Sequence, residues 1–310
     1  MQAELKATTA LLTDQDYRSK PAGPPATLRD LYGSRSLLEI CADVREQAAA
    51  SLGEPVRTLH HFACAGGTLF AKLIASLPNV FVLSEVHPHS MQNPAAKKFA
   101  PSDISLLCQA AGLPEVSDLT ERLFVDALLS AHEWTTRRGG RLILRDHTHS
   151  DFCIPASAGE SLLLKLIGPR CNRVIPVVTV RHPADSFASA KMCEFFYDHE
   201  AKAPYDISFE TYCDRYNQFL DAVDAQLVVK YEDLISDPAA TLSQICDVWS
   251  LEYDEMALEI FSQFQFSGDS GRSGEVIADR PPRPESEQYW QSDADSYVRL
   301  ISRLDYSLRR

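Results

Sequence analysis

Five short strand-like segments recur along this chain, and helical patterns separate them. The segments are 58–63, 80–83, 141–145, 174–180 and 226–230. Strands that alternate with helices predict an α/β fold with a parallel central sheet. Ligands of such sheets bind at the edge where the strands end, so polar residues that directly follow a strand are the first candidates for a site.

Three helices in this pattern have recognisable ends. The first follows a pair of glycines and covers 68–77, and the second has Ser117 as its cap and Gly139 as its stop. The third begins at Pro183, because proline is favoured at the first position of a helix. An amphipathic pattern at 292–310 predicts a C-terminal helix that packs on the core.

The chain also divides near Gly53. A stretch rich in proline and alanine, 19–30, precedes a helical pattern that ends at the break of 53–55. We therefore expect a helical appendage at 1–55 and one α/β domain at 56–310.

Composition argues against several classes of protein. The 310 residues carry a formal net charge of −13, which disfavours nucleic acid as the main partner, because polyphosphate binding needs a basic face. No apolar run approaches the ~20 residues of a membrane span, and the start of the chain lacks the apolar stretch of a secretory signal. The eight cysteines include no C-x-x-C pair, so neither a zinc ribbon nor a disulfide framework is indicated. These features predict a cytoplasmic protein.

The segment CAGGTL, 64–69, predicts an anion site at the end of the first strand. Gly66 and Gly67 let the backbone curl around an anion, and the amides that open the next helix point at it with the positive end of the helix dipole. Thr68 can add its hydroxyl. The nucleotide pattern G-x-x-x-x-G-K-[ST] is absent, so a standard ATP or GTP site is not expected. The alternative is a plain turn between a strand and a helix.

A second anion site is predicted where the fourth strand ends. Arg181 follows the apolar run VIPVVTV, and Ser189 lies eight residues later in a helix, where both can face one spot. The planar guanidinium suits a phosphate, and the serine can donate a further hydrogen bond. The alternative is an ion pair between Arg181 and Asp185.

Two motifs resemble those of the sulfotransferase family, in its bacterial type. RHPADSFASA, 181–190, is similar to the family's 3′-phosphate segment R-[DNH]-P-x-D-x-x-x-S, and LVVKYEDLISDP, 227–238, is similar to its YEDL-x-x-DP region. The strand, loop and helix of 57–77 resemble the family's 5′-phosphosulfate loop. The resemblance covers roughly 57–285 and implies a P-loop NTPase-like three-layer sandwich with a central parallel sheet.

The resemblance also implies a donor, 3′-phosphoadenosine 5′-phosphosulfate (PAPS), and no metal. The residues it assigns to the 5′ end are Cys64, Ala65, Gly66, Gly67, Thr68 and Leu69, and those it assigns to the 3′-phosphate are Arg181 and Ser189. A later segment, 268–274, resembles the loop that closes over the nucleotide and adds Ser270, Gly271 and Arg272; the alternative is a surface loop. Cys64 stands where the family usually has lysine, and Lys72 or Arg145 could supply the missing charge.

Two residues are candidates for the base that takes a proton from the acceptor. RDHTH, 145–149, resembles the family's KTH segment and so points to His147, an imidazole suited to proton removal near neutral pH. Glu85 follows the second strand, where some branches of the family place a glutamate with this function. The alternatives are a histidine hydrogen-bonded in a loop and a glutamate that caps a helix or loop.

A metal site is the competing interpretation of the same region. His147, His149 and Asp151 form H-x-H-x-D, which resembles the zinc segment of metallo-β-lactamase-type hydrolases, although Phe152 stands where that family continues with histidine. The sequence thus predicts a PAPS-dependent sulfotransferase that acts on a hydroxyl or amine of a small-molecule, lipid or carbohydrate acceptor. The alternatives are a catalytically impaired protein of the same fold that binds PAPS or its product 3′-phosphoadenosine 5′-phosphate (PAP), and a zinc metallohydrolase.

Overall fold

The computed structural model describes residues 53–89, 103–153, 159–192, 196–198, 203–204, 206–266, 276–278 and 282–307. The predicted appendage at 1–55 lies outside these residues except for 53–55, so the predicted division of the chain stays a prediction. No helix in the described residues is long and apolar enough to cross a membrane.

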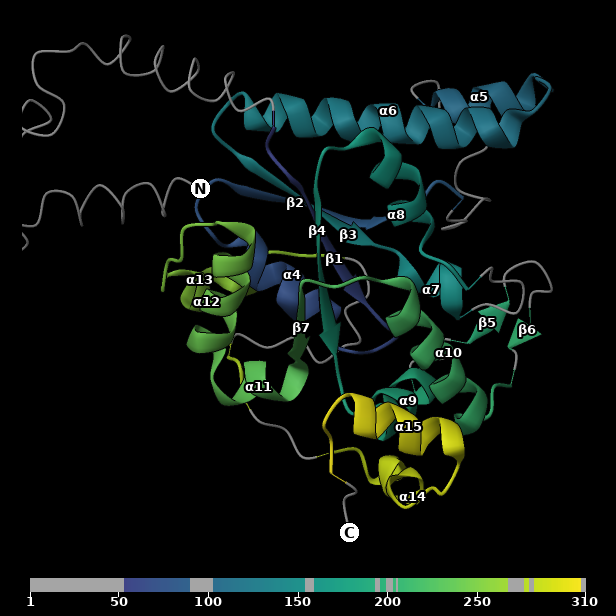
Figure 1. Ribbon diagram of the computed structural model, residues 1–310, viewed down its shortest axis with the longest axis vertical. Coiled ribbons are helices and arrows are strands. Elements are labelled where there is room, and N and C mark those ends of the chain that lie inside the picture. The colour runs from purple at the N-terminus through teal and green to yellow at the C-terminus, as the bar shows by residue number, and fades with distance from the viewer. Residues whose placement is uncertain are drawn as a thin grey trace, which may run out of the picture. The chain divides into compact units, whose positions relative to one another are not determined.

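Five parallel strands form the central sheet, as predicted (Figure 1). They are β1 (Val56–His61), β2 (Val80–Val86), β3 (Arg141–Asp146), β4 (Val174–Val180) and β7 (Leu227–Lys230), in the order β2-β3-β1-β4-β7. The central strand β1 pairs Leu59 with Arg145 of β3 on one side and with Val177 of β4 on the other. Three strands therefore end side by side at one edge of the sheet.

Helices cover both faces of the sheet. The α-helices are α4 (Gly67–Ala75), α5 (Ile104–Ala110), α6 (Val116–Thr136), α7 (Thr148–Phe152), α8 (Leu162–Ile167), α9 (Pro183–Met192), α10 (Phe209–Ala222), α11 (Tyr231–Ser236), α12 (Pro238–Trp249), α13 (Ala257–Ile260), α14 (Glu287–Trp290) and α15 (Asp295–Arg303). Short 3₁₀ helices are Gly168–Arg170, Phe261–Gln263 and Pro284–Ser286, and a small hairpin pairs β5 (Tyr197–Asp198) with β6 (Ala203–Pro204).

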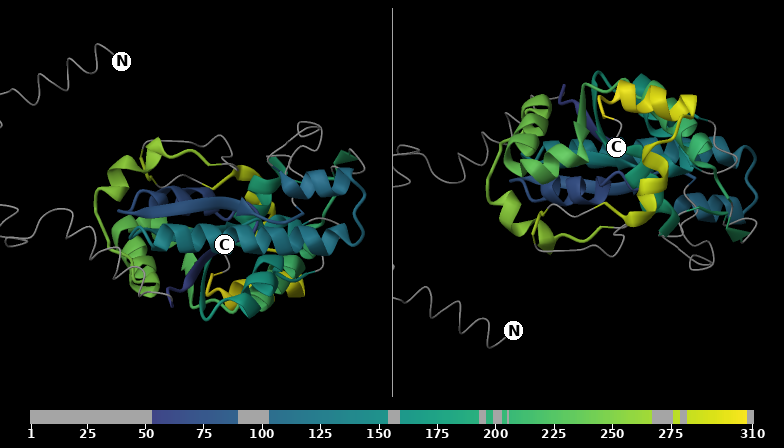
Figure 2. Two further views of the ribbon diagram at one scale, coloured as in Figure 1. Left: turned by 90° about the horizontal axis from the view of Figure 1, so that it is seen from above. Right: turned by 90° about the horizontal axis from the view of Figure 1, so that it is seen from below.

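The alternation of side chains along the strands explains the three layers. Leu59, Val177 and Val229 face a core shared with α4 and α12, whereas Val178 and Val180 on the opposite face pack against α10 and α15. Figures 1 and 2 show α4, α11, α12 and α13 on one side of the sheet and α7, α9, α10 and α15 on the other. The interior strand β4 is buried on both faces and reads as a continuous apolar run, VIPVVTV, whereas Phe81 on β2 and Val228 on β7 are exposed.

One helix begins earlier than predicted. Helix α6 starts at Val116 rather than after Ser117, and its cap residue Glu115 has a left-handed φ of 52° with no capping hydrogen bond from its side chain. The prediction that Ser117 is the cap was wrong, because the chain has already turned into the helix before that residue. Gly139, predicted as the stop, has a φ of 79° just beyond the end of α6, a conformation that glycine adopts without strain.

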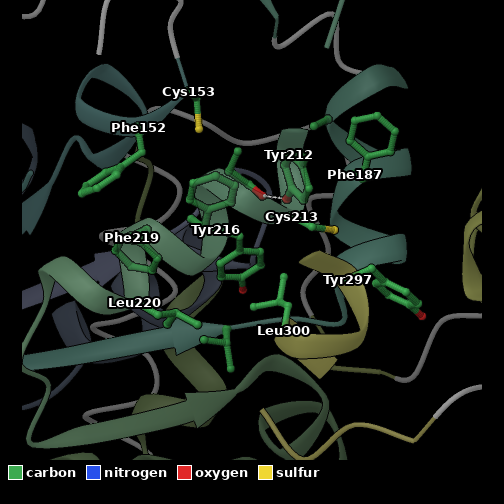
Figure 3. Close-up of a cluster of buried hydrophobic side chains, with 14 of the residues drawn as sticks. Phe152, Cys153, Phe187, Tyr212, Cys213, Tyr216, Phe219, Leu220, Tyr297 and Leu300 are labelled. Atoms are coloured by element: carbon green, nitrogen blue, oxygen red, sulfur yellow. Dashed lines mark hydrogen bonds between the residues drawn. The ribbon is translucent and has the colours of Figure 1, made fainter. Parts of the chain in front are cut away.

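An aromatic cluster on α10 anchors the loop that follows β1 (Figure 3). The ring of Phe62 stacks on Tyr216 with centroids 4.5 Å apart. The buried hydroxyl of Tyr212 donates to the carbonyl of Ala63 at 3.1 Å and also lies within hydrogen-bond distance of the hydroxyl of Ser186 in α9, at 2.9 Å. The core thus ties the loop after β1 to the helix that follows β4.

Candidate active site

The loop between β1 and α4 has a tightly curled backbone. Cys64 and Gly66 have positive φ angles of 56° and 85°. The amide of Ala65 donates to the carbonyl of Phe62 at 3.2 Å, and the amide of Leu69 donates to that of Gly66 at 2.9 Å. The first amides of a helix have no acceptor within it, so α4 presents the amides of Gly67 and Thr68 at the edge where the strands end.

Both glycines of this loop are required by neighbouring rings. A Cβ on Gly66 would overlap the ring of Tyr231 and lie only 3.0 Å from its Cε2 atom. A Cβ on Gly67 would overlap the ring of His61 and lie 2.6 Å from its Nε2 atom. Two aromatic side chains from separate elements therefore pack against the backbone of this loop.

Arg145 brings a positive charge to this loop from β3. Its side chain is only 2% exposed, and its Nη2 donates to the hydroxyl of Thr68 at 3.1 Å. Its Nε donates to His61 at 2.9 Å, and its Nη1 donates to the hydroxyl of Ser84 on β2 at 2.8 Å. A buried guanidinium with three separate acceptors has a fixed plane and a fixed direction. Burial lowers its pKa, an effect that the carboxylate of Glu85 opposes.

The hydrogen bonds of His61 define its protonation. Its Nδ1 lies 3.2 Å from the carbonyl of Phe62, which can only accept, so Nδ1 carries the proton. Its Nε2 then carries the lone pair that accepts from Arg145. Burial and, after it, the charge of Arg145 hold the pKa of His61 well below its ordinary value, in agreement with this neutral form.

Arg181 approaches the same loop from the end of β4. Its Nη1 donates to the carbonyl of Cys64 at 3.4 Å, and its guanidinium lies 4.8 Å from the ring centre of Tyr231. Its backbone amide donates to the hydroxyl of Tyr216 at 3.1 Å. Tyr231, the first residue of the YEDL motif, therefore lies against Gly66 and beneath Arg181 at once.

The helix after β4 holds the other two residues of the predicted 3′-phosphate segment. Asp185 accepts a hydrogen bond from the indole of Trp290 at 3.2 Å, and among the ion pairs of the described residues none joins it to Arg181. Ser189 lies in α9 and is 4% exposed. The ion-pair alternative for Arg181 thus has no support from the described part of the chain.

Glu85 lies beside the buried guanidinium. Its φ is 58°, and the pairing of β2 with β3 is irregular between Leu83 and Val86. One carboxylate oxygen of Glu85 lies 3.4 Å from Nη2 of Arg145, the nitrogen that also reaches Thr68. A left-handed backbone at a non-glycine residue costs free energy, and such strain is concentrated at functional sites.

His147 lies two residues beyond Arg145, at the start of α7. Its Nδ1 is 3.0 Å from the hydroxyl of Ser150, and its side chain is 6% exposed. Burial, followed by the charge of His87, lowers its pKa to about 4, so the ring is neutral at pH 7 and able to accept a proton.

The H-x-H-x-D segment does not form a metal-binding group. The rings of His147 and His149 meet edge to face with centroids 4.1 Å apart. Asp151 instead contacts Nε2 of His87 at 3.0 Å and accepts from the amide of Leu162 at 3.0 Å. Across the described ranges, no three histidine, cysteine, aspartate or glutamate side chains are grouped as a metal ion requires.

Three residues predicted for the nucleotide loop lie outside the described residues. They are Ser270, Gly271 and Arg272.

A comparison with known protein families gives a match to the part of this chain that contains Arg181. Residues 172–255 match the sequence model of the sulfotransferase family. This segment therefore resembles sulfotransferases. The resemblance to sulfotransferases predicted from the motifs is thereby confirmed, and the matched segment includes β4, α9, β7 and the YEDL motif. No curated protein is similar enough to count as a relative.

One solved sulfotransferase domain shares the fold of this chain. The sulfotransferase domain of the Synechococcus PCC 7002 olefin synthase is 18% identical, with a TM-score of 0.51 over 82% of this chain and 96% of that one. The sulfotransferase domain of the curacin biosynthetic pathway is 15% identical, with a TM-score of 0.47 over 82% and 99%. Mouse sulfotransferase SULT7A1 complexed with PAP is 11% identical, with a TM-score of 0.38 over 81% and 83%. At these identities the first match shows a common fold, the P-loop-like fold of sulfotransferases.

Sequence reasoning missed His61, Ser84 and Tyr231. The pair of histidines at the end of the first predicted strand was a usable signal, because a strand end is where polar side chains of a site gather. Tyr231 belongs to the YEDL motif, but the sequence did not indicate which residues its ring contacts. Ser84 carried no signal, because its position depends on the irregular pairing of β2 with β3.

Proposed function

We propose that this chain is an enzyme that transfers a sulfuryl group from PAPS to a hydroxyl or amine. The observation that carries the proposal is the closeness of two anion-binding groups. The glycine loop presents the first amides of α4, and the guanidinium of Arg181 lies 3.4 Å from the carbonyl of Cys64 in that loop. A ligand with a phosphate at each end of one nucleoside fits two such groups better than a triphosphate does.

The loop also fits the 5′ end of this ligand chemically. Its backbone lacks side chains at Gly66 and Gly67, where a Cβ would fill the space that rings already occupy. The amides of Gly67 and Thr68, the hydroxyl of Thr68 and the guanidinium of Arg145 would hold the 5′-phosphosulfate. Arg181 and Ser189 would hold the 3′-phosphate.

The residues around the loop would have different roles in the reaction. PAPS, when bound, supplies the sulfuryl group and is converted to PAP. Arg145 holds a positive charge at the loop, where negative charge grows on the 5′-phosphate. His147, neutral at pH 7, or Glu85 would take the proton from the acceptor.

The acceptor is proposed only by class. A hydroxyl or amine of a small molecule, lipid or carbohydrate is expected, and the net charge of −13 disfavours a polyanionic acceptor. We keep the prediction that the protein works in the cytoplasm.

One observation favours a second candidate, a protein that binds PAPS or PAP without transferring sulfate. Cys64 occupies the loop position where a lysine is expected, and a thiol does not carry the positive charge of lysine. The contact of Arg145 with Thr68 supports the transferase, because it supplies a cation to the loop from another strand.

Calorimetry with PAP and a radiolabelled sulfate-transfer assay test both candidates. We expect PAP to bind more tightly than ATP, and Arg181→Ala to abolish the preference of PAP over adenosine 5′-phosphate. The matched control is Arg170→Ala, which removes an exposed ion pair with Asp126 and leaves that preference unchanged. Stabilisation by ATP alone would contradict nucleotide binding of the proposed kind. PAP binding without transfer to a broad acceptor panel would favour the second candidate.

A further inference from the structure

His61 occupies the space between the glycine loop and the buried guanidinium. Its ring lies directly over the position where Gly67 would carry a Cβ. Its Nδ1 donates to the carbonyl of Phe62, the residue after it, and its Nε2 accepts from Nε of Arg145. One ring therefore contacts the backbone that would hold the 5′-phosphate and the cation that would neutralise it.

We propose that His61 is a positioning residue that aims Arg145 at the 5′-phosphate site, and that Gly67 is glycine to make room for its ring. This inference rests on the proposed function. It assigns to the pair His61 and Arg145 the work that the loop lysine performs in other sulfotransferases.

The orientation of the Arg145 guanidinium follows from its hydrogen bonds. Each of its three nitrogens has a different acceptor: His61 for Nε, Ser84 for Nη1 and Thr68 for Nη2. The bond to His61 sets the rotation of the planar group about its stem, because Nε is the nitrogen closest to the chain. Without that acceptor, the same charge stays near the loop but loses its orientation toward Thr68.

The neutral form of His61 is essential to this arrangement. The charged and titratable groups around the pair are Arg145 itself, Glu85 beside it, and the imidazoles of His60 and His147. A protonated His61 would present a second N–H to Arg145 in place of a lone pair, and two donors cannot bond. Burial and the Arg145 charge both oppose that protonation.

Gly67 provides an independent part of the inference. Its φ is not in the left-handed region, and it is the first residue of α4, so the backbone itself would accept alanine. The obstacle to a side chain is the ring of His61 alone among the nearest atoms. The cost of Gly67→Ala should therefore depend on whether residue 61 has a ring.

The test measures nucleotide binding, so it needs no known acceptor. The affinity ratio of PAP over adenosine 3′-phosphate reports the 5′-phosphate contact, and the ratio of PAP over adenosine 5′-phosphate reports the 3′-phosphate contact. We expect His61→Leu to lower the first ratio about tenfold, the effect of one poorly directed charged hydrogen bond, and to leave the second unchanged. His61→Gln should retain most of the first ratio, because its amide oxygen can replace Nε2 as acceptor.

A double-mutant cycle tests the role of Gly67. Gly67→Ala should lower the first ratio in the wild-type background and have no further effect in the His61→Ala background. The control is His132→Gln, which changes a histidine on α6 that contacts the carbonyl of Glu54 and leaves both ratios unchanged.

The outcomes separate this inference from the proposed function. A folded His61→Leu protein with an unchanged first ratio, or additive effects of Gly67→Ala and His61→Ala, would overturn the role of His61. An equal fall in both ratios would also overturn it, because it would indicate a general structural role. A wild-type protein that does not bind PAP would instead contradict the proposed function.

Discussion

Replacing Gly66 with alanine is the most direct test of why this loop contains its first glycine. Gly66 has a φ of 85°, and a non-glycine residue in the left-handed region costs about 1–2 kcal/mol. A Cβ would also overlap the ring of Tyr231, and forcing an extra carbon into a packed site costs about 1–3 kcal/mol. We therefore expect Gly66→Ala to lower the free energy of unfolding by about 2–5 kcal/mol in all.

The same overlap should weaken the 3′-phosphate contact. Tyr231 supports the guanidinium of Arg181 at 4.8 Å from its ring centre, so a displaced ring displaces that charge. We expect the preference of PAP over adenosine 5′-phosphate to fall severalfold in Gly66→Ala. Adding Tyr231→Ala removes the overlap but keeps the backbone strain, so the two stability effects should be less than additive.

Urea denaturation of the variants measures the stability effect. Gly168→Ala is the matched control, because Gly168 has a helical φ of −52° and nothing within 4 Å of its added Cβ. That control should be neutral or slightly stabilising. If Gly66→Ala were as stable as the wild type, the contact between the loop and Tyr231 would be wrong, and with it the link from the loop to Arg181.

Four further predictions concern the candidate site and the residues that support it. Arg145→Lys keeps the positive charge, but an ammonium cannot contact Thr68, His61 and Ser84 together. We therefore expect the sulfate-transfer rate to fall about a hundredfold, while the affinity for PAP changes less. An unchanged rate would show that the planar guanidinium is unnecessary. If His147 is the base, its pKa of about 4 predicts a rate that rises through pH 4 and is flat between about pH 5 and 7, and a break near pH 6.5 would exclude it. The same lowered pKa should make the fold less stable as pH falls from about 6.5 toward 4, because there the unfolded chain binds a proton that the folded residue does not. Tyr306→Phe removes a 2.7 Å hydrogen bond to Glu232, whose other carboxylate oxygen accepts from the amide of His182. Urea denaturation should show a free energy of unfolding lower by about 1–2 kcal/mol. An unchanged free energy would mean that this hydrogen bond does not support the end of β4.

The fold was largely predictable because its pattern is local. Short strand-like segments alternate with helical patterns in the sequence, and each of the five observed strands overlaps the segment predicted for it. The start of α6 was mispredicted, because the choice between Ser117 and Glu115 depends on a left-handed turn that no residue type in the segment requires.

The candidate site was predictable only where its residues lie close together in the sequence, within one motif. The glycines of 66–67 and the segment from Arg181 to Ser189 are contiguous, so their spacing already indicated phosphate binding. Which cation reaches the loop was left open between Lys72 and Arg145. In the structure, Arg145 contacts Thr68 of the loop, because the parallel pairing of β1 with β3 places Arg145 opposite Leu59 and near the end of β1.

By itself, then, the sequence determined the parallel sheet, the glycine loop after its first strand and the arginine at the end of the fourth strand, because each depends on neighbouring residues. Only the tertiary structure decided that His61 lies between Gly67 and Arg145, and that Tyr231 joins Gly66 to Arg181. The contacts of His61 with Arg145, of Tyr231 with Arg181 and of Tyr231 with Gly66 join residues 84, 50 and 165 positions apart. Sheet register and helix packing, rather than any local propensity, bring these residues together.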